Sequence, residues 1–325
     1  MGLIKRLLKL LGLYLVVQQV IAFWLLKKAD ANESLQTVQS QFHGKAMEFK
    51  KQYEAYEVVH QVENGIERIS YYPKNPRHEN PIVMQHGMWH GAWCWKDWQV
   101  HLAENGWESH AHSLPGHGLS PTQRPIALCT LDYYLAFLNQ EVNRHEKPVI
   151  LMGHSMGGAL IQWYLKYVSD ALPAAVMVAP WGHYSMLPEI INASIMDPIG
   201  ILQTLFTWDA SPQVRNPYQA SRKLISPYAN ISPKELYSKL GKESVLVLLQ
   251  HNPPFWEAPR HIRTPLLWLA AERDALIAEQ RQRQSAEFYG ADYRIIPNIG
   301  HDIMMDQGYL DSISMIEKWL SSQVN

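Results

Sequence analysis

Short, largely apolar runs alternate with amphipathic stretches from residue 74 to the C-terminus. Runs of four to six such residues are typical of strands that are buried on both faces of a sheet. In one stretch between them, Leu131, Tyr134, Leu135, Leu138 and Val142 recur at the spacing of one helix face. The pattern predicts a mostly parallel sheet covered by helices on both faces. The predicted strands are residues 82–85, 107–112, 149–152, 174–179, 265–270 and 293–296.

A β-hairpin is predicted before this alternation begins. Residues 56–62 and 66–72 are rich in β-branched and aromatic side chains, and Asn64-Gly65 lies between them. Asn and Gly adopt the positive φ angles that a type I′ turn requires. We therefore expect two antiparallel strands at the start of the main domain.

One interval, residues 181–258, interrupts the alternation of strands and helices. It holds eight of the 20 prolines, which favours short, broken helices. We interpret it as a helical cap, or lid, inserted into a core formed by residues 56–180 and 259–325. Residues 29–55 are polar, and we expect them to form a stalk or linker before this core.

The first 28 residues contain an apolar run, residues 10–26, which is broken only by Gln18 and Gln19. A helix of this length covers about 25 Å, slightly less than the ~30 Å hydrocarbon core of a bilayer. Three basic residues precede the run and two follow it, which favours a main domain on the non-cytoplasmic side. We predict that residues 1–28 form a transmembrane helix that anchors the protein in a membrane.

Two alternatives for this segment remain open. Ala29-Asp30-Ala31 resembles a cleavage site, and removal of a signal peptide would leave a secreted or periplasmic protein. The basic residues and the two glutamines would also suit a helix that lies in the membrane interface.

Composition narrows the class of protein. Apolar residues make up 47% of the chain and charged residues 18%, which excludes a disordered chain and supports a large buried core. The net charge of −1 gives no basic surface, so we expect no nucleic-acid partner. Cys94 and Cys129 are too few for a disulfide framework or a cysteine-based zinc site.

The most informative motif follows the predicted strand at residues 149–152. Gly153-His154-Ser155-Met156-Gly157 matches Gly-x-Ser-x-Gly, and an apolar helical stretch comes directly after it. A serine on a tight turn between strand and helix needs glycines two positions to each side, because the strand and the helix approach closely there. The N-terminus of the following helix offers free N–H groups to a developing oxyanion. We predict Ser155 as a nucleophile and the Met156 N–H as an oxyanion donor.

A nucleophilic serine requires a histidine base and an acid that orients this base. After a Gly-x-Ser-x-Gly turn, the acid and then the histidine follow the serine along the chain. Asp274 comes after the predicted strand at residues 265–270, with Glu272 as the alternative acid. His301 lies in the loop after the last predicted strand. We therefore predict a triad of Ser155, Asp274 and His301.

A second oxyanion donor is expected in the loop after the strand at residues 82–85. This loop begins His86-Gly87-Met88, and its glycine allows a sharp turn that leaves the Met88 N–H free. Several tryptophans follow within the same loop. We predict that Trp89 and, from the start of the cap, Trp181 line an apolar substrate pocket.

Together these motifs resemble the α/β-hydrolase superfamily over residues 56–322. His86-Gly87-Met88 resembles the oxyanion loop of that superfamily, and residues 114–120 (LPGHGLS) resemble the loop after its next strand. Residues 86–95 are also similar to the plant methylesterase and hydroxynitrile lyase branch. The chain departs from that branch in its N-terminal segment and in Ser113, which replaces the acid that commonly precedes the loop at residues 114–120.

The resemblance implies an α/β-hydrolase fold and a serine hydrolase of the esterase or lipase type. The implied substrate is a small or lipid-like carboxylic ester with an apolar acyl group, cleaved through an acyl-enzyme. No metal or organic cofactor is expected. A hydroxynitrile lyase, a carbon–carbon bond hydrolase and a non-catalytic ligand-binding protein on the same fold remain alternatives, and the sequence gives no oligomeric state.

Overall fold

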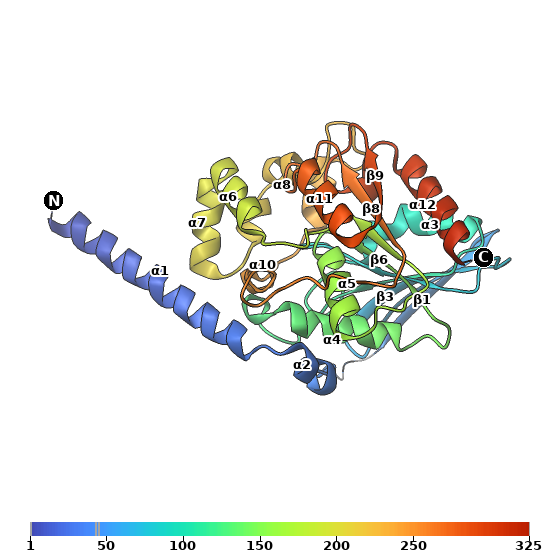
Figure 1. Ribbon diagram of the computed structural model, residues 1–325, viewed down its shortest axis with the longest axis horizontal. Coiled ribbons are helices and arrows are strands. Elements are labelled where there is room, and N and C mark those ends of the chain that lie inside the picture. Colours follow the sequence, from blue (N-terminus) through green and yellow to red (C-terminus); the bar gives the residue numbers. More distant parts are fainter. Residues whose placement is uncertain (1, 43, 45, 325) are drawn as a thin grey trace.

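The computed structural model describes residues 2–42, 44 and 46–324, with residues 2–5, 7, 8, 10, 11 and 15 described by their backbone alone. The predicted domain ranges also include four residues that lie outside the described part: Met1, His43, Lys45 and Asn325. A mixed sheet with the strand order β1-β2-β3-β5-β4-β6-β7-β8-β9 forms the centre of the molecule (Figure 1). Its strands are β1 (Met47–Gln52), β2 (Tyr56–Glu63), β3 (Ile66–Pro73), β4 (Ile82–Gln85), β5 (Ser109–Ser113), β6 (Ile150–His154), β7 (Ala175–Val178), β8 (Leu266–Ala271) and β9 (Asp292–Ile296).

The helices fall into three groups along the chain. Two precede the sheet: α1 (Gly2–Lys28) and α2 (Ala31–Thr37). Five lie between β7 and β8: α6 (Leu187–Met196), α7 (Pro198–Thr207), α8 (Pro217–Leu224), α9 (Pro233–Lys239) and α10 (Val245–Gln250). The others cover the sheet: α3 (Lys96–Glu104), α4 (Leu131–Val142), α5 (Met156–Tyr167), α11 (Glu279–Tyr289) and α12 (Tyr309–Val324).

The parallel half of the sheet forms the buried core. Strands β4, β6, β7 and β8 pair in parallel, and every residue in these four strands is buried. Strands of this kind need cover on both faces, which explains their continuous apolar sequence. The prediction of a mostly parallel sheet covered by helices is confirmed.

The predicted hairpin forms the antiparallel half of the sheet. β2 and β3 pair antiparallel, and the turn residues Asn64 and Gly65 have φ angles of 50° and 70°. β1 pairs antiparallel with β2 on its outer side, and its side chains are exposed. Part of the segment predicted as a linker is thus an edge strand of the sheet.

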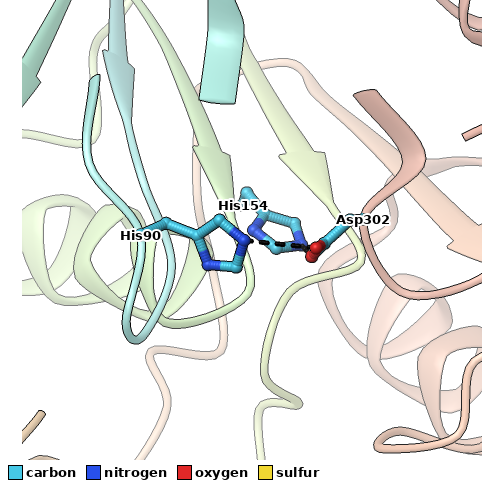
Figure 2. Close-up of side chains that lie close together, drawn as sticks. All are labelled: His90, His154 and Asp302. Carbon is cyan, nitrogen blue, oxygen red and sulfur yellow. Dashed lines mark hydrogen bonds and ion pairs between the residues drawn. The ribbon is translucent and has the colours of Figure 1, made fainter. Parts of the chain in front are cut away.

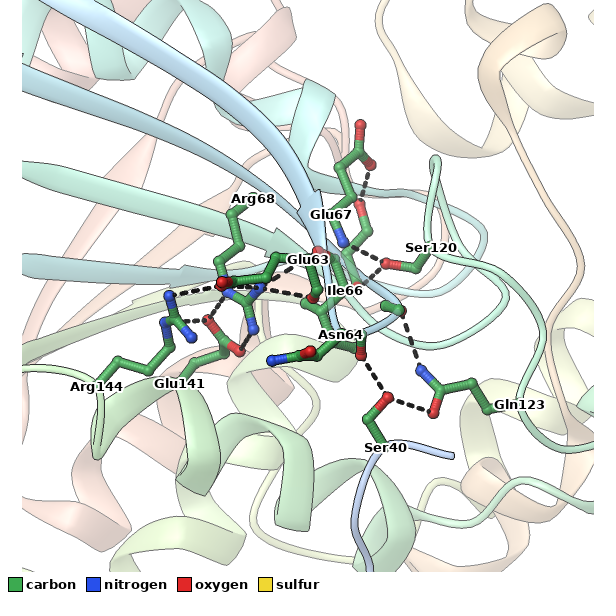
Figure 3. Close-up of polar contacts among 12 residues, drawn as sticks. Ser40, Glu63, Asn64, Ile66, Glu67, Arg68, Ser120, Gln123, Glu141 and Arg144 are labelled. Carbon is green, nitrogen blue, oxygen red and sulfur yellow. Dashed lines mark hydrogen bonds and ion pairs between the residues drawn. The ribbon is translucent and has the colours of Figure 1, made fainter. Parts of the chain in front are cut away.

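A buried ion pair fastens the hairpin to a helix (Figure 3). Arg68 of β3 donates from Nε to Glu141 Oε2 of α4 at 2.6 Å, and its Nη2 donates to the second oxygen of the same carboxylate. Burial by itself raises the pKa of Glu141, but the hydrogen bond and charge of Arg68 hold it below its usual value. The two-point contact orients β3 against α4.

Glu67 of β3 supplies a carboxylate next to Ser113. The Ser113 hydroxyl donates to Glu67 Oε2 at 2.6 Å, and the Leu119 N–H donates to the same oxygen at 2.9 Å. The Glu67 N–H in turn donates to the Ser120 hydroxyl at 2.8 Å (Figure 3). The loop at residues 114–120 is therefore held by an acid from the neighbouring strand instead of one from position 113.

The N-terminal segment forms α1, which extends away from the sheet in Figure 1. Among the residues whose side chains are described, none of the helices has both the length and the apolar character needed to cross a membrane. The predictions of a transmembrane helix, of a membrane partner and of a membrane-anchored localisation were therefore wrong.

Apolar residues near the end of α1 pack against the protein. Ala22 and Leu26 are buried against Leu246 of α10. The ring of Phe23 lies 5.3 Å from that of Phe255, measured between ring centroids. The sequence pattern assigned this apolar run to lipid, whereas the fold places part of it against the helices between β7 and β8.

Candidate active site

Ser155 lies between the end of β6 and the start of α5. Its φ of 52° and ψ of −116° place a non-glycine residue in a strained region of backbone conformation. The Ser155 N–H donates to the Val178 carbonyl of β7 at 3.0 Å, and the Ser155 carbonyl accepts from the Ala159 N–H at 3.2 Å. These bonds hold the strained turn, which is the conformation expected of a nucleophile presented between a strand and a helix.

The glycines around Ser155 are required by close packing. A Cβ atom on Gly153 would lie 2.5 Å from the Gly157 carbonyl oxygen, and one on Gly157 would lie 2.2 Å from the Gln85 carbonyl oxygen. Both oxygens belong to the backbone and have little freedom to move. β4, β6 and α5 can therefore approach one another only where no side chain is present.

The structure brings Asp274 and His301 together from two different loops. Asp274 follows β8, His301 follows β9, and His301 Nδ1 lies 2.7 Å from Asp274 Oδ2. The other oxygen, Asp274 Oδ1, accepts from the N–H groups of Leu276 at 2.8 Å and Ile277 at 3.0 Å. Since an ionised carboxylate only accepts, His301 Nδ1 carries a proton, and in the neutral imidazole Nε2 keeps its lone pair.

The electrostatic surroundings of His301 favour its protonated form. Burial by itself lowers the pKa of His301, but the charge and hydrogen bond of Asp274, together with the charge of Asp302, raise it above its usual value. Glu272, the alternative acid, lies at the surface, where its carboxylate accepts from the Asn298 N–H at 2.8 Å.

The loop after β4 places Met88 in the wall of the cavity that Ser155 also lines. His90 holds this loop at two points: its N–H donates to the Gly87 carbonyl at 3.4 Å, and its Nδ1 donates to the Met88 carbonyl at 2.7 Å. Met156 is the first residue of α5, so its N–H has no acceptor within the helix. The residues predicted as oxyanion donors thus lie on the cavity wall and directly after Ser155.

A largely apolar cavity of about 290 Å³ is lined by Met88, Ser155 and His301. Trp89 and Trp181, which we predicted to bind substrate, both line it. The interval between β7 and β8 supplies much of the remaining wall, through Met186, directly before α6, and through the helix residues Ile190, Ala193, Leu205, Val245 and Leu248. The size and apolar character suit a small organic ligand.

A histidine–aspartate cluster, formed by His90, His154 and Asp302, adjoins the predicted site (Figure 2). His154 directly precedes Ser155, and Asp302 directly follows His301. Sequence analysis did not assign a role to any of the three. Their adjacency to motif residues was visible in the sequence, but their mutual contact depends on three loops that are far apart in the chain.

Histidine and aspartate are common metal ligands, and the nitrogen and oxygen atoms of this cluster lie within 4.8 Å of one another. The same atoms already form hydrogen bonds: His90 Nε2 lies 3.2 Å from Asp302 Oδ2, and His154 Nε2 lies 3.2 Å from the His301 carbonyl. A metal ion would have to displace these bonds. Two further polar atoms of the cluster, His154 Nδ1 and Asp302 Oδ1, are buried without a hydrogen-bond partner among the described residues.

The α/β-hydrolase class is defined by a mostly parallel sheet with a serine on the turn between a strand and a helix. An acid and a histidine follow this serine on later loops. The sequence profile described as "Alpha/beta hydrolase family" matches residues 82–309, and the chain belongs to this family. The predicted superfamily and fold class are thereby confirmed.

Relatives in plants support the predicted similarity to the methylesterase branch. Methylesterase 3 of Arabidopsis thaliana is 27% identical over 110 residues, which are 33% of this chain and 40% of the relative. Pheophorbidase of Raphanus sativus is 26% identical over 227 residues, which are 63% of this chain and 81% of the relative. Norfluorocurarine synthase 1 of Strychnos nux-vomica is 29% identical over 177 residues, which are 51% of this chain and 61% of the relative. The match thus spans less than two thirds of the methylesterase and of the synthase.

Solved structures share the fold at low sequence identity. A monoglyceride lipase from Saccharomyces cerevisiae matches with a TM-score of 0.60 at 13% identity, covering 88% of this chain and 99% of that one. A monoacylglycerol lipase from Paleococcus ferrophilus matches with a TM-score of 0.58 at 18% identity, covering 79% and 99%. At this identity the likeness shows the fold.

Proposed function

We propose that the protein is a serine hydrolase that cleaves carboxylic esters with an apolar acyl group. The observation that carries this proposal is the combination of a strained Ser155 and a hydrogen-bonded Asp274–His301 pair around one apolar cavity. A ligand-binding protein has no use for a nucleophile and a matched base. The names of the relatives, which include methylesterases, and of the lipases that share the fold support ester chemistry.

In the proposed acylation step, His301 Nε2 takes the proton of the Ser155 hydroxyl as Ser155 Oγ attacks the acyl carbon. Asp274 holds His301 in the required tautomer and stabilises its cation. The N–H groups of Met88 and Met156 bind the oxyanion of the tetrahedral intermediate, and one such donor contributes about 10²–10³-fold in rate. His301 then protonates the leaving alcohol.

In the proposed deacylation step, His301 takes a proton from water, which attacks the acyl carbon of the ester on Ser155. The resulting tetrahedral intermediate uses the same two N–H groups. Its collapse releases the carboxylic acid and returns the proton to Ser155. No step in this cycle requires a group beyond the residues named and one water molecule.

Turnover of p-nitrophenyl esters from acetate to decanoate, by wild type and by protein labelled with a fluorophosphonate, tests the proposal. We expect hydrolysis that increases from acetate to a medium acyl chain and disappears on labelling. Cleavage of a cyanohydrin without cleavage of any ester would instead support the lyase alternative. Ligand binding without turnover would support the non-catalytic alternative.

The proposed base sets the pH dependence. Because the pKa of His301 is raised, and because a base acts only when unprotonated, kcat/KM should fall as the pH decreases through a value above about 6.5, the ordinary histidine pKa. A profile of kcat/KM from pH 5 to 9 measures this limb. A limb centred clearly below pH 6 would contradict the assignment of His301.

We also propose that residues 181–258 act as a cap that sets acyl preference, because the helices in this interval line the cavity. Ala193 of α6 lies in that wall, and Ala193→Phe should fill part of the cavity. We expect kcat/KM for decanoate esters to fall about tenfold or more, with acetate esters little affected, since a bulky side chain excludes only the longer chain.

Ile195→Phe is the matched control for this variant. Ile195 lies on the same helix, and 76% of it is exposed to solvent. The chain-length profile of this variant should match wild type. Equal effects of the two substitutions, or an unchanged profile in Ala193→Phe, would contradict the role of the cap.

A further inference from the structure

We infer that His90 and Asp302 are positioning residues that join the loop carrying Met88 to the loop carrying His301. The inference rests on the proposed function, because it concerns the groups proposed to act in ester hydrolysis. His90 follows β4 and Asp302 follows β9, so their contact joins positions 212 residues apart in the chain (Figure 2). Both side chains are buried.

His90 bridges two hydrogen-bond acceptors. Its Nδ1 lies 2.7 Å from the Met88 carbonyl oxygen, and its Nε2 lies 3.2 Å from Asp302 Oδ2. A carbonyl oxygen only accepts, so Nδ1 carries a proton. The bond to Asp302 needs one further proton, held either by Nε2 or by the carboxyl group. The complete bridge is therefore a proton-sharing pair with no net charge.

The bridge holds the peptide group that directly follows the proposed oxyanion donor. In a trans peptide the Met88 N–H points away from the Gly87 carbonyl, which accepts from the His90 N–H at 3.4 Å. The bond from His90 Nδ1 fixes the next carbonyl, that of Met88. Trp89 lies between Met88 and His90 and has a φ of 64°. Such a strained value persists only where surrounding contacts hold it. Loss of the His90 side chain therefore frees the Met88 carbonyl, which belongs to the peptide group that directly follows the Met88 N–H.

Asp302 holds the other end of the bridge. Its N–H donates to the Leu224 carbonyl at 2.7 Å, and its carboxylate is fully buried. His154 Nε2 donates to the His301 carbonyl at 3.2 Å and lies 3.5 Å from Asp302 Oδ1. Burial lowers the pKa of His154 well below its usual value, so His154 stays neutral. His90 is thus the side chain that shares a proton with the buried carboxyl group of Asp302 across the 3.2 Å contact.

The chain contains a second buried histidine–carboxylate pair of the same kind. His117 Nε2 lies 3.1 Å from Glu243 Oε2, its Nδ1 lies 3.3 Å from the Pro115 carbonyl, and both side chains are fully buried. In the described part of the chain, this pair forms no hydrogen bond with Ser155, Asp274 or His301. It therefore provides a matched control for a purely structural role.

His90→Gln tests the inference, because the single amide nitrogen of glutamine cannot reach both acceptors. With p-nitrophenyl butyrate we expect kcat to fall about 10–100-fold with KM changed less than about threefold, as for a weakened oxyanion donor. The Ki of butylboronic acid should rise by the factor by which kcat/KM falls, because its tetrahedral adduct uses the same N–H groups. In His117→Gln, kcat and this Ki should stay within about threefold of wild type.

Two substitutions of Asp302 test the positioning role of the His90–Asp302 contact even if His90→Gln does not fold. In Asp302→Asn the amide N–H donates to Nε2 of a neutral His90, so Nδ1 still donates to Met88 and kcat should stay within about fivefold of wild type. Asp302→Ala removes the partner and should lose about as much as His90→Gln.

Each of the following results would overturn the inference: equal losses in His90→Gln and His117→Gln, equal losses in Asp302→Asn and Asp302→Ala, or stoichiometric zinc that His90→Gln releases. An active wild type with an unaffected His90→Gln variant would overturn this inference alone. A wild type that hydrolyses no ester would overturn the proposed function and the inference with it.

Discussion

Ser155→Ala is expected to lower kcat for ester hydrolysis by about 10⁴-fold or more, because acyl transfer then has no covalent route. The remaining activity would come from the oxyanion donors and the cavity, which hold the ester near water. The fold should persist, since alanine keeps the Cβ at the strained φ of 52° and removes only the hydroxyl. Steady-state kinetics together with a thermal unfolding midpoint close to wild type measures both outcomes.

Ser185→Ala is the control for Ser155→Ala. Ser185 lies within residues 181–258, the proposed cap, and its hydroxyl donates to Asn252 Oδ1 at 2.6 Å. It is not among the described residues that line the cavity next to His301. This variant should keep full turnover and full fluorophosphonate labelling, whereas Ser155→Ala should lose both. A loss of only a few-fold in Ser155→Ala would contradict a covalent mechanism.

The core of the fold was predictable because it is encoded locally. Strands buried on both faces, such as β6 and β8, need uninterrupted apolar residues, and the sequence shows these runs directly. The Gly-x-Ser-x-Gly turn was predictable for a similar reason, because three elements meet where Gly153 and Gly157 lack side chains.

Elements that depend on distant partners were not predictable in this way. β1 has the sequence MEFKKQ, and its side chains are exposed, so the sequence shows only a weak apolar pattern there. The strand is held in place by its antiparallel pairing with β2. The apolar run in α1 does not by itself reveal which part of the protein it contacts. Only the fold shows that Ala22 and Leu26 contact Leu246.

The histidine–aspartate cluster illustrates the same limit at the site. His90, His154 and Asp302 each stand beside a recognisable motif residue, but no spacing rule connects loops after β4, β6 and β9. Their hydrogen bonds arise because parallel strands end at the same edge of the sheet. The choice between Asp274 and Glu272 was open for a related reason, since the two acids are two residues apart at the end of one strand.

Asp274→Asn is expected to lower kcat/KM by about 10³–10⁴-fold through the tautomer of His301. The backbone fixes how the asparagine amide would lie. The N–H groups of Leu276 and Ile277 both donate to Oδ1, so the amide oxygen takes that position and the NH₂ group replaces Oδ2. That NH₂ group would donate to His301 Nδ1, which places the imidazole proton on Nε2 and removes the lone pair that accepts the proton of Ser155.

Glu272→Gln is the matched control for Asp274→Asn, because it makes the same chemical change two residues away. Glu272 is exposed and accepts a hydrogen bond from the Asn298 N–H, which a glutamine oxygen accepts equally well. We therefore expect kcat/KM within about threefold of wild type, as for most surface substitutions. Measurement of both variants with one ester substrate compares the two acids directly. A larger loss in Glu272→Gln than in Asp274→Asn would assign the orienting acid to Glu272 and contradict the 2.7 Å contact between Asp274 and His301 as the functional one.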